Sequence, residues 1–391
     1  MKLPKSNTSL YPLVPVLYAV VILLTAAGCN KASLGESYPE PFYGQLLAGD
    51  SLITPVAQVV SDRVFEDSAY VVVKQFIVHP EAATEDTPAE RISPAPVAAV
   101  VDAAEDYLYL FDKETFTLRK FSIADGTLQF AIEIDVEQKR NGRPVLRLVS
   151  DEVLWIANIE KGKIVRYTSA GERLSDLDMP GLGTPIVADD GAFVIANYED
   201  NEGLFHSYSP RMKKQDAFGV LTNIKVALQG IPYPGHGMGF MGEGVTDGSH
   251  SFVYAGLLGG GLLSYKMDGS LRYFRESIDH SNFPGVREDT TRQVTVLSTD
   301  MEGVETQQIP FNVWNDTYYQ FYSVIGEEDW GWDAYDYNSG DYKYSIRRSN
   351  QCGNNFITDT HVYANCLNRG FFQMKRAEAV NSSKQALAAI N

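Results

Sequence analysis

One sequence pattern recurs along the chain, and it restricts the possible folds more than any other feature. Each copy has a short apolar run, a polar connection and a second apolar run, and the first run ends on a small polar residue or glycine. In four of the five copies large apolar residues stand six and nine positions after that end residue, and in the third copy the second run comes two residues later. The five end residues are Asp112, Asn158, Asn197, Gly256 and Asn365. A repeat of this kind predicts equivalent structural units that pack against one another.

Each unit predicts one small antiparallel sheet. Three copies close on a turn signal, at Asp125-Gly126, Ala170-Gly171 and Asp268-Gly269, after which another strand can follow. Successive end residues are 46, 39, 59 and 109 positions apart, and the last interval has room for two units. The segment 308–348 supplies the missing copy. Six units of about 40 to 50 residues predict an all-β, six-bladed β-propeller with four-stranded antiparallel blades over residues 54–376.

The ends of the predicted ring require a closing device. The last copy has too few strands after Met374 for a complete blade, whereas segment 54–80 has strand-like residues that belong to no copy. An N-terminal strand that completes the last blade would protect both open edges. We therefore expect the closing strand within 54–80 and a C-terminal tail over 377–391.

The N-terminus has the features of an export signal. Two lysines precede an apolar run, 13–27, that ends in the small residues of "LTAAGC". This ending resembles the lipobox of bacterial lipoproteins, which implies cleavage before Cys29 and acylation of its thiol. Residues 1–28 are then a lipoprotein signal peptide, and the Gly-, Pro- and Ser-rich segment 29–53 is a tether. An uncleaved anchor helix and an ordinary signal with a chance cysteine are the alternatives.

The repeated unit itself resembles a known class of blade. The stretch "LWIAN…GKIVRYTSAGE" is similar to NHL-type and TolB-like blades. Together with the lipobox, it resembles the six-bladed propeller lipoproteins of Gram-negative bacteria. This resemblance implies a lipid-anchored protein of the cell envelope, and Asn30 rather than Asp after Cys29 favours the outer membrane. A formal net charge of −17 argues against a nucleic-acid partner.

Two stretches contain candidate ligand-binding residues. Segment 233–248 leads into the fourth copy, so its second half should form the strand beside the channel and place His236 and Glu243 near the channel mouth. The alternative is that its glycines are required because little space is left for side chains near the axis of the ring. Segment 326–333, "GEEDWGWD", is predicted to be a loop in which Trp330 and Trp332 could stack on a sugar ring or hold a cation. Packing of these tryptophans on their own blade is the alternative.

The remaining cysteines predict a disulfide. Once Cys29 is acylated, Cys352 and Cys366 form an even pair in a chain exported to a compartment where disulfides persist. They are equidistant from Asp359, the centre of a predicted hairpin, and should face each other. Two buried free thiols are the alternative.

These features favour a binding or scaffolding module without a cofactor, which would contact a protein or carbohydrate through loops on one face, especially 230–250 and 326–333. The chain has no HxH, HExxH, GxSxG or CxxC motif. Because other six-bladed propellers are lactonases, a metal-dependent enzyme is one alternative. Its divalent cation would be bound by Asp189, Glu243, Asn312 and Asn355. A structural subunit of an envelope complex is the other alternative.

Overall fold

The fold is described from a computed structural model of the whole chain. The structure describes residues 45–48, 51–66, 70–78, 98–112, 115–134, 144–150, 153–158, 162–179, 183–196, 203–222, 242–257, 260–281, 285–289, 296–300, 306–327, 330–347, 352–366 and 369–376. Cys29 and His236 lie outside these ranges. None of the described residues forms a helix of the length and apolar character that a membrane crossing needs.

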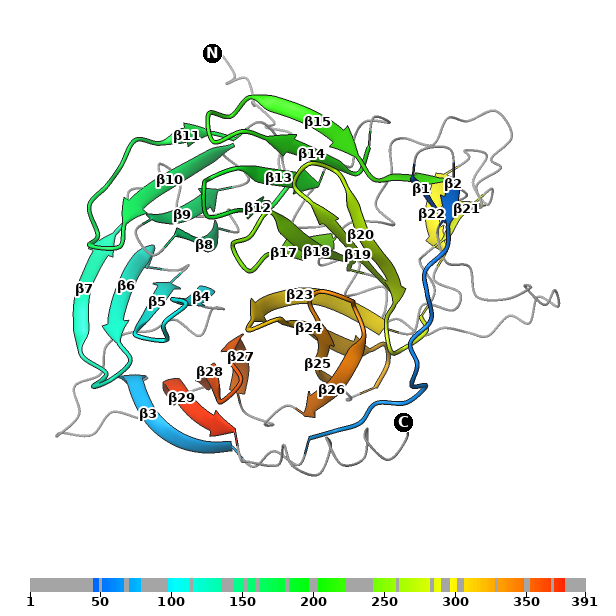
Figure 1. The fold of residues 1–391 in the computed structure, drawn as a ribbon. Coiled ribbons are helices and arrows are strands. Elements are labelled where there is room, and N and C mark those ends of the chain that lie inside the picture. The colour runs from blue at the N-terminus through cyan, green and yellow to red at the C-terminus, as the bar shows by residue number, and fades with distance from the viewer. Residues whose placement is uncertain are drawn as a thin grey trace, which may run out of the picture.

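In the described part of the chain, six four-stranded antiparallel sheets are arranged in a ring around a central axis, as the repeat predicts (Figure 1). Blade one contains β4 Ala98–Val101, β5 Tyr107–Asp112, β6 Thr117–Ser122 and β7 Leu128–Glu133. Blade two contains β8 Pro144–Ser150, β9 Val153–Asn158, β10 Lys163–Thr168 and β11 Leu177–Asp178. Blade three contains β12 Pro185–Val187, β13 Phe193–Ala196, β14 Phe205–Tyr208 and β15 Lys214–Phe218.

Blade four contains β17 Gly242–Val245, β18 Ser251–Gly256, β19 Gly261–Lys266 and β20 Leu271–Glu276. Blade five contains β23 Thr306–Trp314, β24 Thr317–Val324, β25 Trp330–Asp336 and β26 Tyr342–Arg347. Blade six joins β27 Cys352–Ile357, β28 His361–Cys366 and β29 Gly370–Arg376 to the N-terminal β3 Tyr70–Val78. The predicted closure by a strand within 54–80 is therefore confirmed.

The core of the molecule is divided among the blade interfaces. The described residues form six clusters of buried apolar side chains, and each cluster lies between two neighbouring blades. Because successive side chains of a strand point to opposite sheet faces, each blade contributes to two clusters. This explains why the strands of the repeat are apolar along most of their length.

The turn features of the repeat have the predicted structural roles. The Asp112 carboxylate accepts a hydrogen bond from the Thr115 amide at 3.1 Å, so this end residue stabilises its turn. The glycines of the three turn signals, Gly126, Gly171 and Gly269, have φ angles between 77° and 88°. This left-handed conformation favours glycine.

The N-terminal chain also runs along the outside of the ring (Figure 1). Strands β1 Gln45–Ala48 and β2 Ser51–Ile53 pair with β16 Val220–Thr222, which follows blade three. Residues 54–66, here called the belt, then bridge to the outer strands of blades four and five through Val56–Arg275 and Phe65–Ser345. The strands β1 and β2 fall within the segment predicted as a tether. A separate hairpin, β21 Gly285–Asp289 and β22 Val296–Asp300, follows blade four.

The belt is attached mainly through polar contacts. The Gln58 amide donates to the Glu276 and Gly340 carbonyls at 2.7 and 3.0 Å, and its oxygen accepts from the Tyr342 amide at 2.9 Å. These bonds connect blades four and five. Arg63 forms ion pairs with Asp279 and Asp333, two acids from different parts of the chain.

The predicted loop at 326–333 is wrong for its second half. Residues 330–333 are in strand β25, and Trp332 is only 2% exposed among the apolar residues between blades five and six. Residues 331–335 of the run "WGWDAYD" are all buried, because both faces of β25 pack against neighbouring blades, and the acids before the run obscured the strand in the sequence.

Candidate ligand site at the channel mouth

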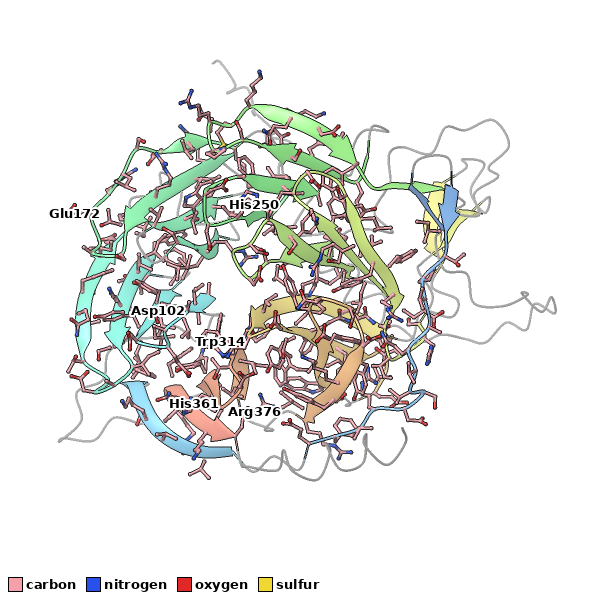
Figure 2. All side chains as sticks on the ribbon, viewed as in Figure 1. Asp102, Glu172, His250, Trp314, His361 and Arg376 are labelled. Carbon is pink, nitrogen blue, oxygen red and sulfur yellow. The ribbon has the colours of Figure 1, made fainter. Side chains whose placement is uncertain are left out.

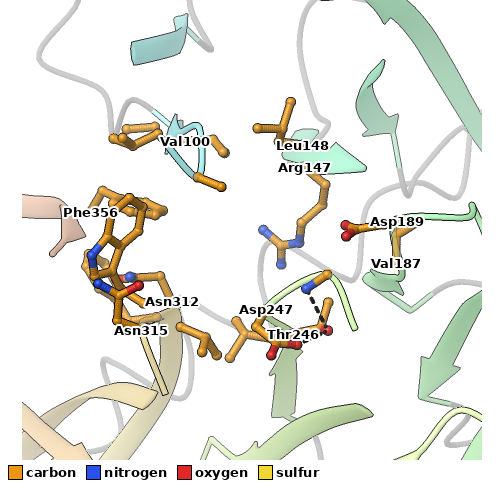
Figure 3. A pocket seen from close by; sticks show the side chains of 18 of the residues that line it. Val100, Arg147, Leu148, Val187, Asp189, Thr246, Asp247, Asn312, Asn315 and Phe356 are labelled. Carbon is orange, nitrogen blue, oxygen red and sulfur yellow. Dashed lines mark hydrogen bonds between the residues drawn. The ribbon is translucent and has the colours of Figure 1, made fainter. Parts of the chain in front are cut away.

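A cavity of about 580 Å³ lies at one mouth of the central channel, and the first strands or first turns of all six blades line it (Figure 3). Its lining includes Val100, Arg147, Asp189, Asp247, Trp314 and Phe356, one residue from each blade in chain order. Ligand pockets of proteins commonly have volumes of roughly 300–1,000 Å³. The cavity is therefore large enough for a small organic molecule.

The lining residues show which end of the channel is involved. They stand from the middle to the end of the first strands and in the turns that follow, such as Gly248 after β17 and Asn315-Asp316 after β23. We call this end of the ring the turn face. The end of β24 and the residues 325–327 that follow it lie on the opposite face, because β24 runs antiparallel to β23.

Arg147, in the middle of β8, supplies a positive charge to the cavity. Its guanidinium points into the pocket in Figure 3, and its Nη1 donates to the Leu146 carbonyl at 3.2 Å. Burial lowers the pKa of Arg147, and the carboxylate of Glu243 opposes this effect. An arginine remains charged despite such a shift, because its ordinary pKa is above 12.

An aromatic wall formed by Phe311, Trp314 and Phe356 lies on the side of blades five and six. The rings of Trp314 and Phe356 meet edge to face, with their centroids 5.9 Å apart. Phe311 is backed by the buried Trp332, at a centroid distance of 6.0 Å. Trp314 projects toward the centre of the ring in Figure 2 and remains partly exposed, so its ring is accessible from the channel.

Carboxylates surround the mouth. The exposed Asp189, Asp247 and Asp316 line the cavity from blades three, four and five. The absence of a side chain at Gly248 allows Asp189 to approach the next blade, because a Cβ there would lie 2.1 Å from Asp189 Oδ1. A backbone hydrogen bond of 2.8 Å from Asp189 N to the Gly248 carbonyl fixes the same approach.

Contacts between blades hold the turn face in place. Glu105, in the first turn of blade one, accepts a hydrogen bond from the Tyr363 hydroxyl and lies beside His361 Nδ1, both at 2.9 Å. Burial acts to raise the pKa of Glu105, but these contacts with His361 and Tyr363 hold it below its usual value. Blade one and blade six, where the ring closes, are thus joined next to the pocket.

The structure separates the predicted ligand-binding residues from one another. Glu243 lies in β17, the innermost strand of blade four as predicted, but the described cavity lining does not include it. Trp332 is buried behind Phe311 and is not among the residues that line the described cavity. Trp330 is half-buried and packs on Phe321, at the end of its blade opposite to the turn face.

The four residues that would bind a divalent cation in the enzyme alternative also lie in different environments. Asp189 and Asn312 line the cavity, whereas the side chain of Asn355 lies outside the described residues. Both amide atoms of Asn312 bond the backbone of Ile357, at 2.8 and 3.2 Å, so this side chain joins blades five and six. Within the described part of the chain, no three His, Cys, Asp or Glu side chains are gathered as a metal site.

Cys352 and Cys366 are register partners on β27 and β28, as the predicted bridge requires. Cys366 is disulfide-bonded in the structure. The side chain of Cys352 lies outside the described residues, and its pairing with Cys366 stays a prediction.

Sequence reasoning missed Arg147, Trp314 and Phe356. A signal for Arg147 was present, since it is the one charge within the apolar strand "PVLRLVS" before the second copy. Trp314 and Phe356 have no comparable signal because each also fits the apolar pattern of its blade. Their shared exposure to the channel depends on the arrangement of the whole ring.

Comparisons with known proteins concern the fold. No family model matches the chain, and a search of curated proteins finds no match. A DUF4221 family member from Bacteroides vulgatus is similar with a TM-score of 0.50 at 10% identity, over 80% of this chain and 98% of that one. A putative exported protein from Bacteroides fragilis gives 0.44 at 10% identity over 79% and 86% of the two chains. BamB from Moraxella catarrhalis gives 0.38 at 11% identity over 81% and 100%.

Proposed function

We propose that this chain is a binding module of the bacterial cell envelope that takes its ligand in the cavity on the turn face. One observation carries the proposal: the first strands or turns of all six blades line a single cavity that combines apolar walls, aromatic rings and one arginine. A concave pocket in which polar groups converge beside apolar and aromatic walls is a common form of a small-ligand site. The ligand is a small molecule or the end of a protein or carbohydrate partner.

The proposed location rests on the N-terminal sequence. Cleavage before Cys29 and acylation of its thiol would attach the chain to a membrane of the envelope, and Asn30 favours the outer membrane. The mass of the N-terminal peptide from the mature protein checks this point. A peptide that begins at an acylated Cys29 supports the anchor, and one that still contains residues 1–28 contradicts it.

The ligand site can be tested by filling the cavity. Val100 lines the pocket from β4 and is partly exposed to it, so Val100→Trp would place an indole in the ligand space. We would measure melting temperatures of the wild type and this variant with a panel of amino acids, dipeptides, saccharides and carboxylates. The proposal expects compounds that raise the melting temperature of the wild type and not that of the variant.

The matched control is Val59→Trp, because Val59 is 90% exposed on the belt, outside the cavity. It should respond to the panel like the wild type. If every stabilising compound acts equally on Val100→Trp, or if no compound acts on the wild type, the cavity is not the binding site.

A further inference from the structure

We infer that the ligand of this cavity carries a single carboxylate, bound by Arg147, and a flat apolar group that packs on Trp314 and Phe356. This inference rests on the proposed function, because it names the chemical class of ligand that the same cavity would accept. It follows from three features of the cavity, namely its cation, its aromatic wall and the charge of its rim.

The first feature is the guanidinium of Arg147, on which the Glu243 carboxylate acts electrostatically but with which no described carboxylate forms an ion pair. None of the ion pairs formed among the described residues includes Arg147. Its hydrogen bond to the Leu146 carbonyl uses one of five N–H donors. Two other largely buried arginines illustrate the contrast, since Arg63 and Arg376 each bind a carboxylate. A ligand carboxylate would give Arg147 the planar, two-point partner that suits its geometry.

The second feature is the aromatic wall opposite this cation. In Figure 3 the side chains of blades five and six face Arg147 across the cavity. The edge-to-face contact with Phe356 holds the indole of Trp314 in one orientation, which leaves ring surface toward the cavity. Aromatic surfaces of this kind contribute to binding by burying apolar area and by offset stacking. The ligand therefore has a flat apolar part next to its charged group.

The third feature limits the charge of the ligand. Asp189, Asp247 and Asp316 stand around the mouth, and the whole chain has a formal net charge of −17. Repulsion by these acids disfavours phosphorylated or polyanionic ligands, because several negative charges would have to pass the rim to reach one arginine. One carboxylate satisfies Arg147 with the least repulsion.

The test uses two probes of the same shape, 2-naphthoate and its neutral analogue 2-naphthamide. Isothermal titration calorimetry on the mature wild-type protein should give a dissociation constant at least tenfold lower for 2-naphthoate. Arg147→Gln should raise the dissociation constant of 2-naphthoate at least tenfold and leave that of 2-naphthamide unchanged. Arg147→Lys should retain part of the preference for 2-naphthoate over 2-naphthamide. Trp314→Leu should weaken both probes.

Arg173→Gln is the matched control. Arg173 also belongs to blade two and loses the same charge, but it is exposed and pairs with Asp176 away from the cavity. Its probe affinities should equal those of the wild type. If Arg147→Gln does not fold, the comparison of the two probes on the wild type decides the question alone.

The outcomes separate this inference from the proposed function. Any of three results overturns the inference that the ligand carries a carboxylate. The wild type binds the two probes with equal affinity, it binds neither probe, or Arg147→Gln binds 2-naphthoate as tightly as the wild type does. In each of these cases the panel with Val100→Trp still shows whether the cavity is a ligand site. If Val100→Trp binds 2-naphthoate as well as the wild type does, the site itself is wrong.

Discussion

At the scale of single residues, one acid that the sequence places at the surface is buried in the structure. Asp333 was expected in an exposed loop, but in β25 it is 0% exposed. It accepts hydrogen bonds from Arg63 Nε and Nη2 at 3.0 and 3.1 Å and from the Ser345 hydroxyl at 2.6 Å. The sequence could not show this because the partner, Arg63, is 270 positions away and belongs to no repeat.

This burial predicts a specific dependence of stability on pH. Burial raises the pKa of Asp333 to about 6, although Arg63 opposes the shift, and Asp279 on the same arginine adds to it. Between the unfolded pKa of 3.8 and about 6, the folded protein binds the proton more tightly than the unfolded chain. This contribution to the free energy of unfolding therefore decreases as the pH rises through that window, and it is constant above it.

Asp333→Asn removes the titration and keeps the shape of the side chain. The free energy of unfolding of the wild type minus that of this variant should therefore fall between about pH 4 and pH 6, and level off above. Urea unfolding followed by tryptophan fluorescence at several pH values measures it. Asp178→Asn, at a 91% exposed carboxylate, is the control and should show no such trend. A difference that is flat or rises over this window contradicts the raised pKa of Asp333.

At the scale of elements, the hairpin β27–β28 shows what a sequence pattern can and cannot reveal. The sequence pairs Cys352 with Cys366 by equal distance from Asp359. In the structure the turn pairs Ile357 with Val362, a register that would place Cys352 opposite residue 367. A bulge between Asn354 and Phe356 shifts the strand by one residue and restores the partners. The two cysteines are thus confirmed as register partners. Their pairing, however, depends on a bulge that the sequence pattern does not predict.

The same register predicts a disulfide in the exported protein. Mass spectrometry of the non-reduced protein should find a Cys352–Cys366 peptide, and the Cys352→Ala/Cys366→Ala variant should be less stable by about 3 kcal/mol, the value for a loop of roughly fourteen residues. The reduced wild type is the control and should unfold like the variant. Two alkylatable thiols at these positions in exported material would refute the bridge.

At the scale of the whole molecule, the repeat predicted the ring, the blade count and its closure because all three depend on periodic apolar residues. The belt could not be predicted in the same way. It is attached by isolated polar side chains, Gln58 and Arg63, and by single bridges at Val56 and Phe65, none of which has a period. The pocket likewise depends on six strand ends that meet only after the ring has closed.

Two successive N-terminal deletions distinguish the roles of the belt and of β3. Removal of residues 29–66 leaves Asp279 and Asp333 without Arg63, and Arg376 without its partner Glu66, so the melting temperature should fall. Blade six keeps its fourth strand, and this protein should remain monomeric.

Removal of residues 29–78 also exposes the edge of β29, which β3 covers along its length from Gly370 to Arg376. An unpaired edge of this kind templates pairing with other chains, so the longer deletion should aggregate.

Removal of residues 29–43 alone, ahead of β1, is the control and should leave the melting temperature unchanged. Size-exclusion chromatography with light scattering measures the outcome. A monomeric protein after the longer deletion would show that β3 does not close the ring, and aggregation after the shorter one would assign that role to the belt as well.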